Sequence, residues 1–257
     1  MNEKNGKIEI SIILACYNAS SYIEESVKQI QDVMDATVYH YELIFVDDKS
    51  KDDTVHKIRN LIKNKKNCHL YLHRTNCGRG KTVFDGFRKS KGEIIGFIDL
   101  DLDNPARYIF SMVLGIKKGD ADICTAQRVY RWRYNPYFLI RILMSKVYAK
   151  LSSIWLQTGL KDTETGCKFF KKEKIISILK QTKSRGWFWD TEVMTRAHYA
   201  GLKIIEVPTL FVRNTKVSTV TLLPDVMKYL YHLIQFGSVN RELRNKWLYR
   251  KEKENIF

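Results

Sequence analysis

Three aspartates at a spacing of two, Asp99, Asp101 and Asp103, are the residues whose type and pattern most directly suggest chemistry. They follow the apolar run 94–98, which predicts a buried strand, and an Asn-Pro pair comes directly after them. In an extended segment this spacing places all three carboxylates on one side. Converging carboxylates repel one another unless a cation lies between them, and oxygen-only ligands suit Mg²⁺ or Mn²⁺. The alternative is a solvated acidic turn, although the preceding strand is too apolar for the surface.

Strands and helices alternate in the stretch that leads to these aspartates. Apolar runs at 8–14, 41–46, 70–72 and 94–98 are separated by segments of helical period at 20–34, 52–65 and 79–90. This alternation predicts an α/β fold with a mostly parallel sheet, flanking helices and right-handed crossovers. A further strand is expected at 168–171.

The polar clusters of the chain lie at the predicted strand ends. These clusters are 17–18, 47–48, 76–81 and 99–103. Ligands of open α/β sheets bind outside the carboxyl ends of the strands. We therefore expect all four clusters to form one site.

Charge and cysteine usage narrow the class of protein. The chain has 257 residues, with 44 Lys and Arg against 28 Asp and Glu, and its net charge of +16 favours polyanionic partners such as nucleic acid, phosphorylated metabolites or an anionic membrane surface. Five cysteines without a Cys-x-x-Cys pair indicate free thiols in a reducing compartment. The six histidines show no metal-ligand spacing, so we interpret them as structural. Neither a signal peptide nor a run of 18 apolar residues is present, and we expect a cytoplasmic protein without a membrane-spanning helix.

Two helical segments of the second half have a membrane-like pattern. Residues 123–161 contain no acidic residue, and within them 137–155 has apolar residues at helical spacing interrupted by cations. This pattern suits a helix in a membrane interface and equally a core helix with snorkelling cations. A second helix is expected at 219–236, followed by a basic tail at 241–253 that is either a solvated end or a binder of anionic lipid.

The motifs, in their order, resemble a family 2 glycosyltransferase with the GT-A fold, and more narrowly the polyprenyl-phosphate sugar synthases such as dolichyl-phosphate mannose and glucose synthases. The resemblance extends from about residue 9 to residue 236. The segments that carry it are 12–18 (IILACYN), 46–54 (VDDKSKDDT), 76–81 (NCGRGK), 99–103 (DLDLD), 162–168 (DTETGCK) and 189–192 (WDTE). It implies a catalytic domain at 1–215, which includes a helix at 135–157, and an amphipathic helix with a basic tail at 216–257.

The resemblance implies that a nucleoside-diphosphate sugar, UDP- or GDP-linked, binds at the first strand ends. The residues implied in nucleotide-sugar binding are Ala15, Tyr17, Asn18, Asp47, Asp48, Gly78, Lys81, Asp99 and Asp101. Ala15 stands where the family usually has proline, which affects loop rigidity rather than chemistry. One of Asp47 and Asp48 could instead cap the helix near Ser50. A Gly-x-Gly pair such as that at Gly78 is often only a turn, although its backbone N–H groups could approach a phosphate.

The resemblance also assigns the metal and catalytic roles. Asp99 and Asp101 match the Asp-x-Asp metal motif, and Asp103 stands where the branch usually has a glutamine that contributes to the metal. The divalent ion would stabilise the departing nucleoside diphosphate. Asp190, Asp101 and Arg128 are the implied catalytic residues. Asp190 occupies the position of a general base, which a hydroxyl acceptor needs in an inverting displacement. A phosphate acceptor already carries negative charge and needs cations instead.

Four residues resemble the acceptor-phosphate site of the polyprenyl-phosphate branch: Arg128, Arg141, Ser145 and Arg213. Arg141 and Ser145 are four apart and share one helical face, whereas Arg128 is expected just after the fifth strand. Arg141 could instead be a snorkelling surface cation. Asp162 is expected to order Arg128 or to contact the sugar.

The sequence thus predicts an inverting glycosyltransferase that moves a sugar to a polyprenyl phosphate. It would bind peripherally to an anionic membrane surface at the cytosolic face, with a membrane protein as a possible partner. The alternative is a family 2 enzyme that acts on a glycan hydroxyl with Asp190 as base. A nucleic-acid-binding module explains the charge but not three aspartates at one strand end, so nucleic acid is not expected as a partner. A non-catalytic membrane-docking protein of the same fold is a further alternative that we do not favour.

Overall fold

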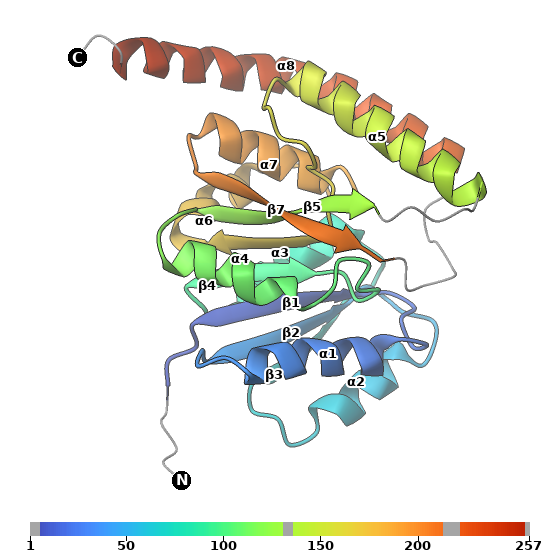
Figure 1. Cartoon of the computed structure of the whole chain (residues 1–257). Helices are drawn as coiled ribbons and strands as arrows, with labels where there is room; N and C mark the ends of the chain where they lie inside the picture. Colours follow the sequence, from blue (N-terminus) through green and yellow to red (C-terminus); the bar gives the residue numbers. More distant parts are fainter. Residues whose placement is uncertain (1–5, 131–135, 213–221, 255–257) are drawn as a thin grey trace.

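A single twisted sheet forms the centre of the computed structural model, which describes residues 6–130, 136–212 and 222–254 (Figure 1). Its strands lie in the order β3-β2-β1-β4-β6-β5-β7. They are β1 (Ile10–Cys16), β2 (Tyr41–Asp47), β3 (Cys68–Leu72), β4 (Ile94–Ile98), β5 (Ile123–Tyr130), β6 (Cys167–Lys171) and β7 (Ile204–Phe211). β6 is antiparallel to its neighbours β4 and β5, and all other pairs are parallel.

Helices cover both faces of this sheet. One face carries α1 (Ile23–Asp35), α2 (Thr54–Ile62) and α4 (Tyr108–Lys117), and the other carries α3 (Arg79–Lys89), α6 (Lys172–Gln181) and α7 (Trp189–Tyr199). In β1, Ile12 and Leu14 join the core of the first face, whereas Ile13 joins that of the second. A strand buried on both faces needs a continuous apolar run, which is the pattern seen in the sequence.

Two long helices, α5 (Pro136–Leu156) and α8 (Leu222–Glu254), form a further layer over α7 (Figure 1). Leu156, Phe188, Leu233 and Phe236 make a small core beneath it. α8 includes the basic segment that was predicted to be a tail after residue 236, because this segment contains good helix formers and no proline. The division of the chain at residue 215 stays a prediction.

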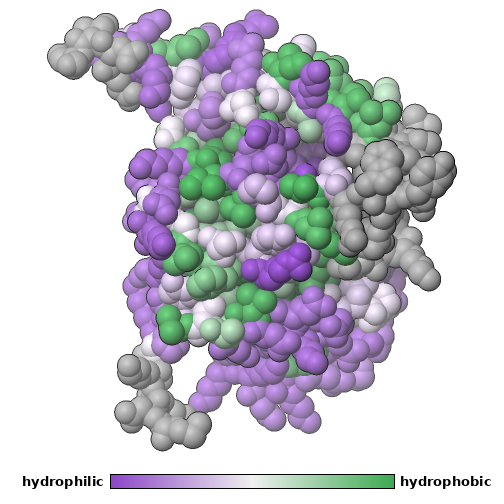
Figure 2. Space-filling model, in the orientation of Figure 1, coloured by the Kyte–Doolittle hydropathy of each residue, from purple (hydrophilic) through white to green (hydrophobic). Residues whose placement is uncertain are grey.

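The α5–α8 layer exposes large apolar side chains. Those on α5 are Leu143, Val147, Leu151, Ile154 and Trp155, and those on α8 include Met227, Tyr231 and Ile234. Their spacing of three or four places them in one stripe along each helix. Figure 2 shows hydrophobic surface over this layer, interrupted by hydrophilic residues. Within the described ranges, none of the helices is both long and apolar enough to span a bilayer.

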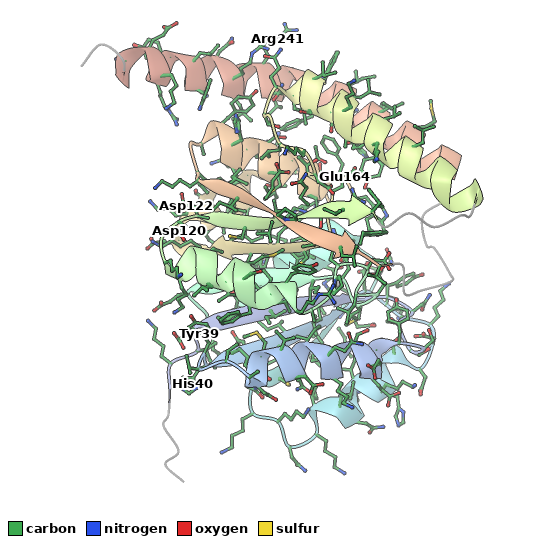
Figure 3. All side chains as sticks on the ribbon, in the orientation of Figure 1. Tyr39, His40, Asp120, Asp122, Glu164 and Arg241 are labelled. Atoms are coloured by element: carbon green, nitrogen blue, oxygen red, sulfur yellow. The ribbon has the colours of Figure 1, made fainter. Side chains whose placement is uncertain are left out.

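A buried carboxyl group lies beneath this layer, in the loop before β6. Figure 3 shows Glu164 between α7 and α5. Burial raises the pKa of Glu164 to about 8, with Arg128 opposing the shift and Asp162 adding to it. Burial raises the pKa values of Tyr148 in α5 and Tyr229 in α8, and the negative charge of Glu164 raises them further.

The predicted α/β class and GT-A layout are confirmed. The sequence did not indicate that β6 runs antiparallel between β4 and β5. Arg128 was expected after the fifth strand, yet it lies within β5, because parallel pairing with β7 continues to Tyr130.

Candidate functional site

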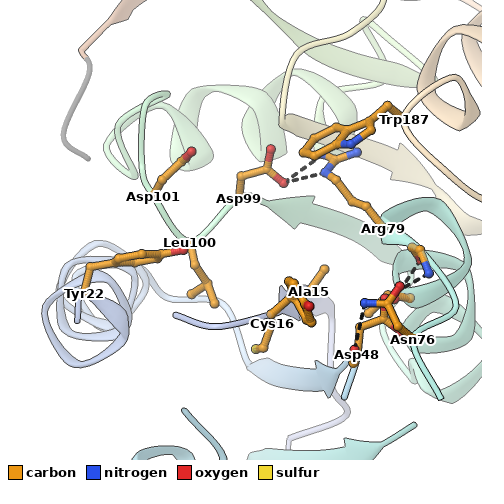
Figure 4. A pocket seen from close by; sticks show the side chains of 13 residues that line it. Ala15, Cys16, Tyr22, Asp48, Asn76, Arg79, Asp99, Leu100, Asp101 and Trp187 are labelled. Atoms are coloured by element: carbon orange, nitrogen blue, oxygen red, sulfur yellow. Dashed lines mark hydrogen bonds and ion pairs between the residues drawn. The ribbon is translucent and has the colours of Figure 1, made fainter. Parts of the chain in front are cut away.

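A cavity of about 300 Å³ opens at the carboxyl ends of β1, β2 and β4 (Figure 4). It is lined by Ala15, Cys16, Tyr17, Tyr22, Asp48, Asn76, Gly78, Arg79, Thr82, Asp99, Leu100, Asp101 and Trp187. Six residues of the predicted nucleotide-sugar set are therefore in its wall: Ala15, Tyr17, Asp48, Gly78, Asp99 and Asp101. The strand ends meet here because β1 pairs with both β2 and β4.

Asp48 holds together the loop that forms one wall of the cavity. Its Oδ1 accepts hydrogen bonds from the backbone N–H of Cys77 at 2.7 Å and lies 2.8 Å from Nδ1 of His73. Its Oδ2 accepts the N–H of Gly78 at 2.9 Å, and its carbonyl accepts Nδ2 of Asn76 at 3.1 Å. The backbone N–H of Gly78, which the sequence suggested for a phosphate, is therefore used within the protein.

His73 was interpreted as structural without a metal-ligand spacing. In the structure His73, Asp48 and Cys77 each offer one potential ligand atom, and these atoms lie within 4.8 Å of one another. The sequence did not indicate this grouping because Asp48 follows β2, whereas His73 and Cys77 belong to the loop between β3 and α3. Since the Asp48 carboxylate already accepts loop N–H groups, we interpret the grouping as the anchor of the loop.

The other predicted nucleotide-binding residues stand outside the cavity wall. Asp47 accepts the backbone N–H of Ser50 at 3.0 Å and so orders the loop before α2, which begins at Thr54 without a side-chain cap from either aspartate. Asn18 accepts the backbone N–H of Lys51 at 2.8 Å, and Lys81 forms an ion pair with Asp85. Their role as nucleotide ligands stays a prediction.

The three aspartates do not extend the strand. β4 ends at Ile98, and the N–H of Leu102 donates to the carbonyl of Asp99 at 3.1 Å, so the chain turns with a positive φ of 49° at Leu102. Among the described residues, the ligand oxygens of Asp99, Asp101 and Asp103 do not all lie within 4.8 Å of one another. The expected extended backbone was wrong because a turn follows the strand directly, and the metal role of the three aspartates stays a prediction.

The electrostatics of this turn nevertheless fit a divalent cation. Burial, with repulsion from Asp103 and Asp99, raises the pKa of Asp101 to about 7. Burial also raises the pKa of Asp99, while Arg79 opposes that shift. The Asp101 Oδ1 accepts the backbone N–H of Asp103 at 3.2 Å, so these two residues are close. Carboxylates that repel one another and offer only oxygen ligands suit Mg²⁺ or Mn²⁺, because a divalent cation removes the repulsion.

Arg79 is the cation that the structure places among these carboxylates. Its Nε and Nη2 donate to Oδ1 of Asp99 at 3.0 and 2.8 Å (Figure 4). Its Nη1 donates to Asp190. Burial alone lowers the pKa of Arg79, but the charges of Asp190 and Asp99 raise it above its ordinary value. The sequence did not reveal this role, and the only signal was a basic residue between two glycines.

Asp190 is fully engaged by cations. It is 1% exposed at the first turn of α7, and its second oxygen accepts Nζ of Lys168 at 2.9 Å. Lys168 is itself completely buried in β6 and also donates to the carbonyl of Thr165. A buried lysine and a buried arginine on one carboxylate make an ion-paired centre between the cavity and the α7 layer.

The glycines of the Gly-x-Gly loop are required by packing. A Cβ on Gly80 would lie 2.3 Å from Cβ of Trp189, and one on Gly78 would lie 2.9 Å from the carbonyl oxygen of Arg185. Gly78 also has a φ of 89°, which other residues rarely adopt. The loop is thus held against the segment that carries Trp187 and Asp190.

The predicted acceptor-phosphate residues are only partly described. Arg128 forms two parallel hydrogen bonds with Asp162, from Nε at 2.7 Å and from Nη2 at 2.8 Å, as expected for Asp162. Arg141 and Ser145 belong to α5, but their side chains are outside the described part. Arg213 also lies outside the described residues.

A twisted, mostly parallel sheet with acidic turns at its carboxyl edge and a cavity between them defines a GT-A-type fold. The model of "Glycosyl transferase family 2" matches residues 11–179. The chain therefore belongs to glycosyl transferase family 2, and the predicted membership is confirmed.

Similar proteins of known sequence include transferases of this kind. The chain is 26% identical over 203 residues to "Glycosyltransferase AglD" of Haloferax volcanii, covering 78% of this chain and 32% of that protein. It is 25% identical over 242 residues to "Dolichol-phosphate mannosyltransferase" of Pyrococcus furiosus, covering 91% and 66%. The chain thus spans from about a third to just under two thirds of the length of these relatives.

Solved structures share the fold. Glucosyl-3-phosphoglycerate synthase of Mycobacterium tuberculosis in complex with Mn²⁺, UDP and phosphoglyceric acid superposes with a TM-score of 0.65 at 18% identity, covering 90% of this chain and 77% of that one. Residues 1–349 of S. aureus TarS in complex with UDP-GlcNAc superpose with a TM-score of 0.59 at 16% identity, covering 90% and 66%. At these identities the likeness is one of fold.

Proposed function

We propose that the chain transfers a sugar, with inversion, from a nucleoside-diphosphate sugar to a polyprenyl phosphate. The observation that carries this proposal is the state of Asp190, whose two oxygens are held by Arg79 and Lys168. A hydroxyl acceptor needs a base that is able to take its proton. A phosphate monoester loses its second proton near pH ~6 and is already anionic, so it needs no such base. The similarity to a dolichol-phosphate mannosyltransferase supports the same acceptor.

The donor would occupy the cavity at the carboxyl ends of β1, β2 and β4. Tyr17, which is 39% exposed, offers a ring at the cavity wall, and Asp48 fixes the loop opposite. Asp99, Asp101 and Asp103 would hold Mg²⁺ or Mn²⁺, which when bound would stabilise the diphosphate as a leaving group. The M. tuberculosis structure, which contains Mn²⁺ and UDP, supports a divalent ion and a UDP-type donor in this fold.

The acceptor would approach from the side of β5. Arg128, ordered by Asp162, would attract the lipid phosphate together with Arg141, Ser145 and Arg213. A phosphate oxygen then forms a bond to the anomeric carbon of the sugar, and the bond from that carbon to the diphosphate oxygen breaks. The electron pair leaves with the nucleoside diphosphate. Asp190 orients Arg79 and Lys168 in this scheme and takes no proton.

We further propose peripheral attachment to the cytosolic face of a membrane. The exposed apolar stripes of α5 and α8 and the exposed Lys146 and Lys150 suit an anionic lipid surface. A membrane protein could add to this attachment. The rival, a glycan hydroxyl as acceptor with Asp190 as base, requires that Asp190 first give up an ion pair.

The first test is transfer itself. Purified protein with Mn²⁺ or Mg²⁺ is incubated with UDP- and GDP-sugars and a short polyprenyl phosphate, and sugar is measured in the organic phase. The matched control replaces the lipid by the same polyprenol without phosphate. We expect metal-dependent transfer from one donor to the phosphate and none to the alcohol. Transfer only to the polyprenol or to a glycan would favour the hydroxyl acceptor.

A further inference from the structure

Arg79 lies where two carboxylates of the site meet. It is the first residue of α3, and its side chain is 11% exposed. The guanidinium carbon lies 5.1 Å from the ring centroid of Phe97 and 5.3 Å from that of Trp187. Aromatic neighbours and two ion pairs thus fix a single position for this side chain.

Arg79 holds one particular oxygen of Asp99, a residue of the cavity wall. Both of its donors to Asp99 meet Oδ1. The other oxygen, Oδ2, packs against the loop before β6, since a Cβ on Gly166 would lie only 1.9 Å from it. A cation that approaches Asp99 from the cavity therefore meets an oxygen that already accepts two hydrogen bonds.

We propose that Arg79 is an internal counter-cation that competes with the divalent ion for Asp99. It neutralises Asp99 before the donor binds, and it releases Asp99 when the ion arrives while it stays paired with Asp190. The diphosphate of the donor offers new acceptors for the freed N–H groups, so nucleotide and ion assist each other's binding. This inference deepens the proposed function and rests on its divalent-ion site.

The test measures Mn²⁺ binding without donor or lipid, by the magnetic resonance signal of the free ion. In Arg79→Gln the competitor is gone, and we expect Mn²⁺ to bind about fivefold or more tightly than in the unaltered protein. Arg74→Gln is the matched control, because it removes the same charge from an exposed arginine close by in the chain. Equal or weaker Mn²⁺ binding by Arg79→Gln, or equal tightening in Arg74→Gln, would overturn the proposal.

A second measurement keeps Arg79 in place and follows the fluorescence of Trp187, with Trp187→Phe only as the reference for the other tryptophans. Release of Arg79 from Asp99 changes the cation beside Trp187, so Mn²⁺ should alter the fluorescence of this ring at the concentration at which the ion binds. Subtracting the response of Trp187→Phe removes the contribution of the other four tryptophans and leaves the signal of Trp187. A Trp187 signal that stays constant at saturating Mn²⁺ would overturn the proposal. Neither readout involves sugar transfer, so failure here is distinct from failure of the proposed function.

Discussion

In the donor cavity, the carboxylates of Asp48 and Asp99 form hydrogen bonds and ion pairs with other residues of the chain, whereas the α5–α8 layer leaves large apolar side chains exposed. Asp48 accepts three hydrogen bonds or ion-pair contacts from one loop, and Arg79 joins Asp99 to Asp190. In contrast, Ile154 on α5 and Ile234 on α8 are 62% and 67% exposed. The polar groups of the cavity are thus ordered by the chain itself, whereas the α5–α8 layer leaves apolar surface exposed.

This contrast implies that the two regions have separable tasks. A cavity with ordered polar groups loses little entropy when a donor binds, which is the advantage of preorganisation. An exposed apolar stripe gains free energy only when something covers it. We therefore expect variants in one region to spare the task of the other.

The largest effect is expected from Asp101→Asn in the donor region. Asp101 lines the cavity, and its pKa near 7 reflects burial beside Asp103 and Asp99, a position that a divalent ion would stabilise. Loss of its charge should reduce sugar transfer by roughly 10²- to 10³-fold, the usual cost of removing one electrostatic contact to the reacting groups. The measurement is the initial rate of transfer into the organic phase.

Asp120→Asn is the control for this variant, because Asp120 is exposed at the far end of the sheet and has the same side chain. Its transfer rate should equal that of the unaltered protein. Both variants should bind lipid vesicles normally. If Asp101→Asn keeps its rate, the metal assignment is wrong.

A smaller and complementary effect is expected from the double variant Ile154→Glu and Ile234→Glu. Burying one such side chain in an apolar phase contributes about 1.5–3 kcal/mol, and a carboxylate reverses this gain. Partitioning into vesicles that contain anionic lipid should fall by at least about tenfold, the ratio that corresponds to ~1.4 kcal/mol. The measurement is co-sedimentation of the protein with the vesicles.

Val38→Glu is the matched control, because Val38 is 89% exposed in the loop before β2, away from α5 and α8. It should leave partitioning unchanged. Binding of a nucleoside diphosphate by the double variant should also be unchanged. Equal partitioning of the double variant and the unaltered protein would show that the exposed stripes do not face the membrane.

The first half of the fold was predictable because β1, β2 and β4 are buried on both faces. Runs such as 94–98 are apolar throughout, and the helices between them have regular period, so the type and order of the elements up to β4 followed from local pattern. The strand β7 and the helices α4, α6 and α7 were not predicted. The direction of β6 was not predictable, since pairing between β4 and β5 depends on contacts distant in the sequence. The length of α8 was missed because charged side chains dominate residues 241–253 and hide the helical period there.

The site was predictable in location but not in its internal pairing. Because Ala15, Asp48 and Asp99 lie at predicted strand ends, we expected them at one edge of the sheet, and they do line one cavity. The links of Arg79 to Asp99 and Asp190 join residues 20 and 111 positions apart, and no local pattern specifies such contacts. The turn after Ile98 depends on a positive φ at Leu102. Leucine rarely adopts this conformation, so the sequence does not predict the turn.

The smallest effect concerns Glu164, which lies where the two regions meet. Its carboxyl is buried near Arg128, Lys168, Asp162 and Asp190, and its pKa is raised to about 8. A carboxyl with a raised folded-state pKa contributes stability that is fully present below its unfolded-state pKa near ~4.3 and is lost as pH rises through 8.

Glu164→Gln keeps the shape of the side chain and cannot ionise. We expect the free energy of unfolding of this variant to match that of the unaltered protein at pH 3.5, where the carboxyl is protonated in both states, and to exceed it by at least about 2 kcal/mol at pH 8.5. Urea unfolding at a series of pH values measures the difference, and Glu173→Gln, at an exposed position, should show none. Parallel curves for Glu164→Gln and the unaltered protein would mean that folding does not raise the pKa of Glu164.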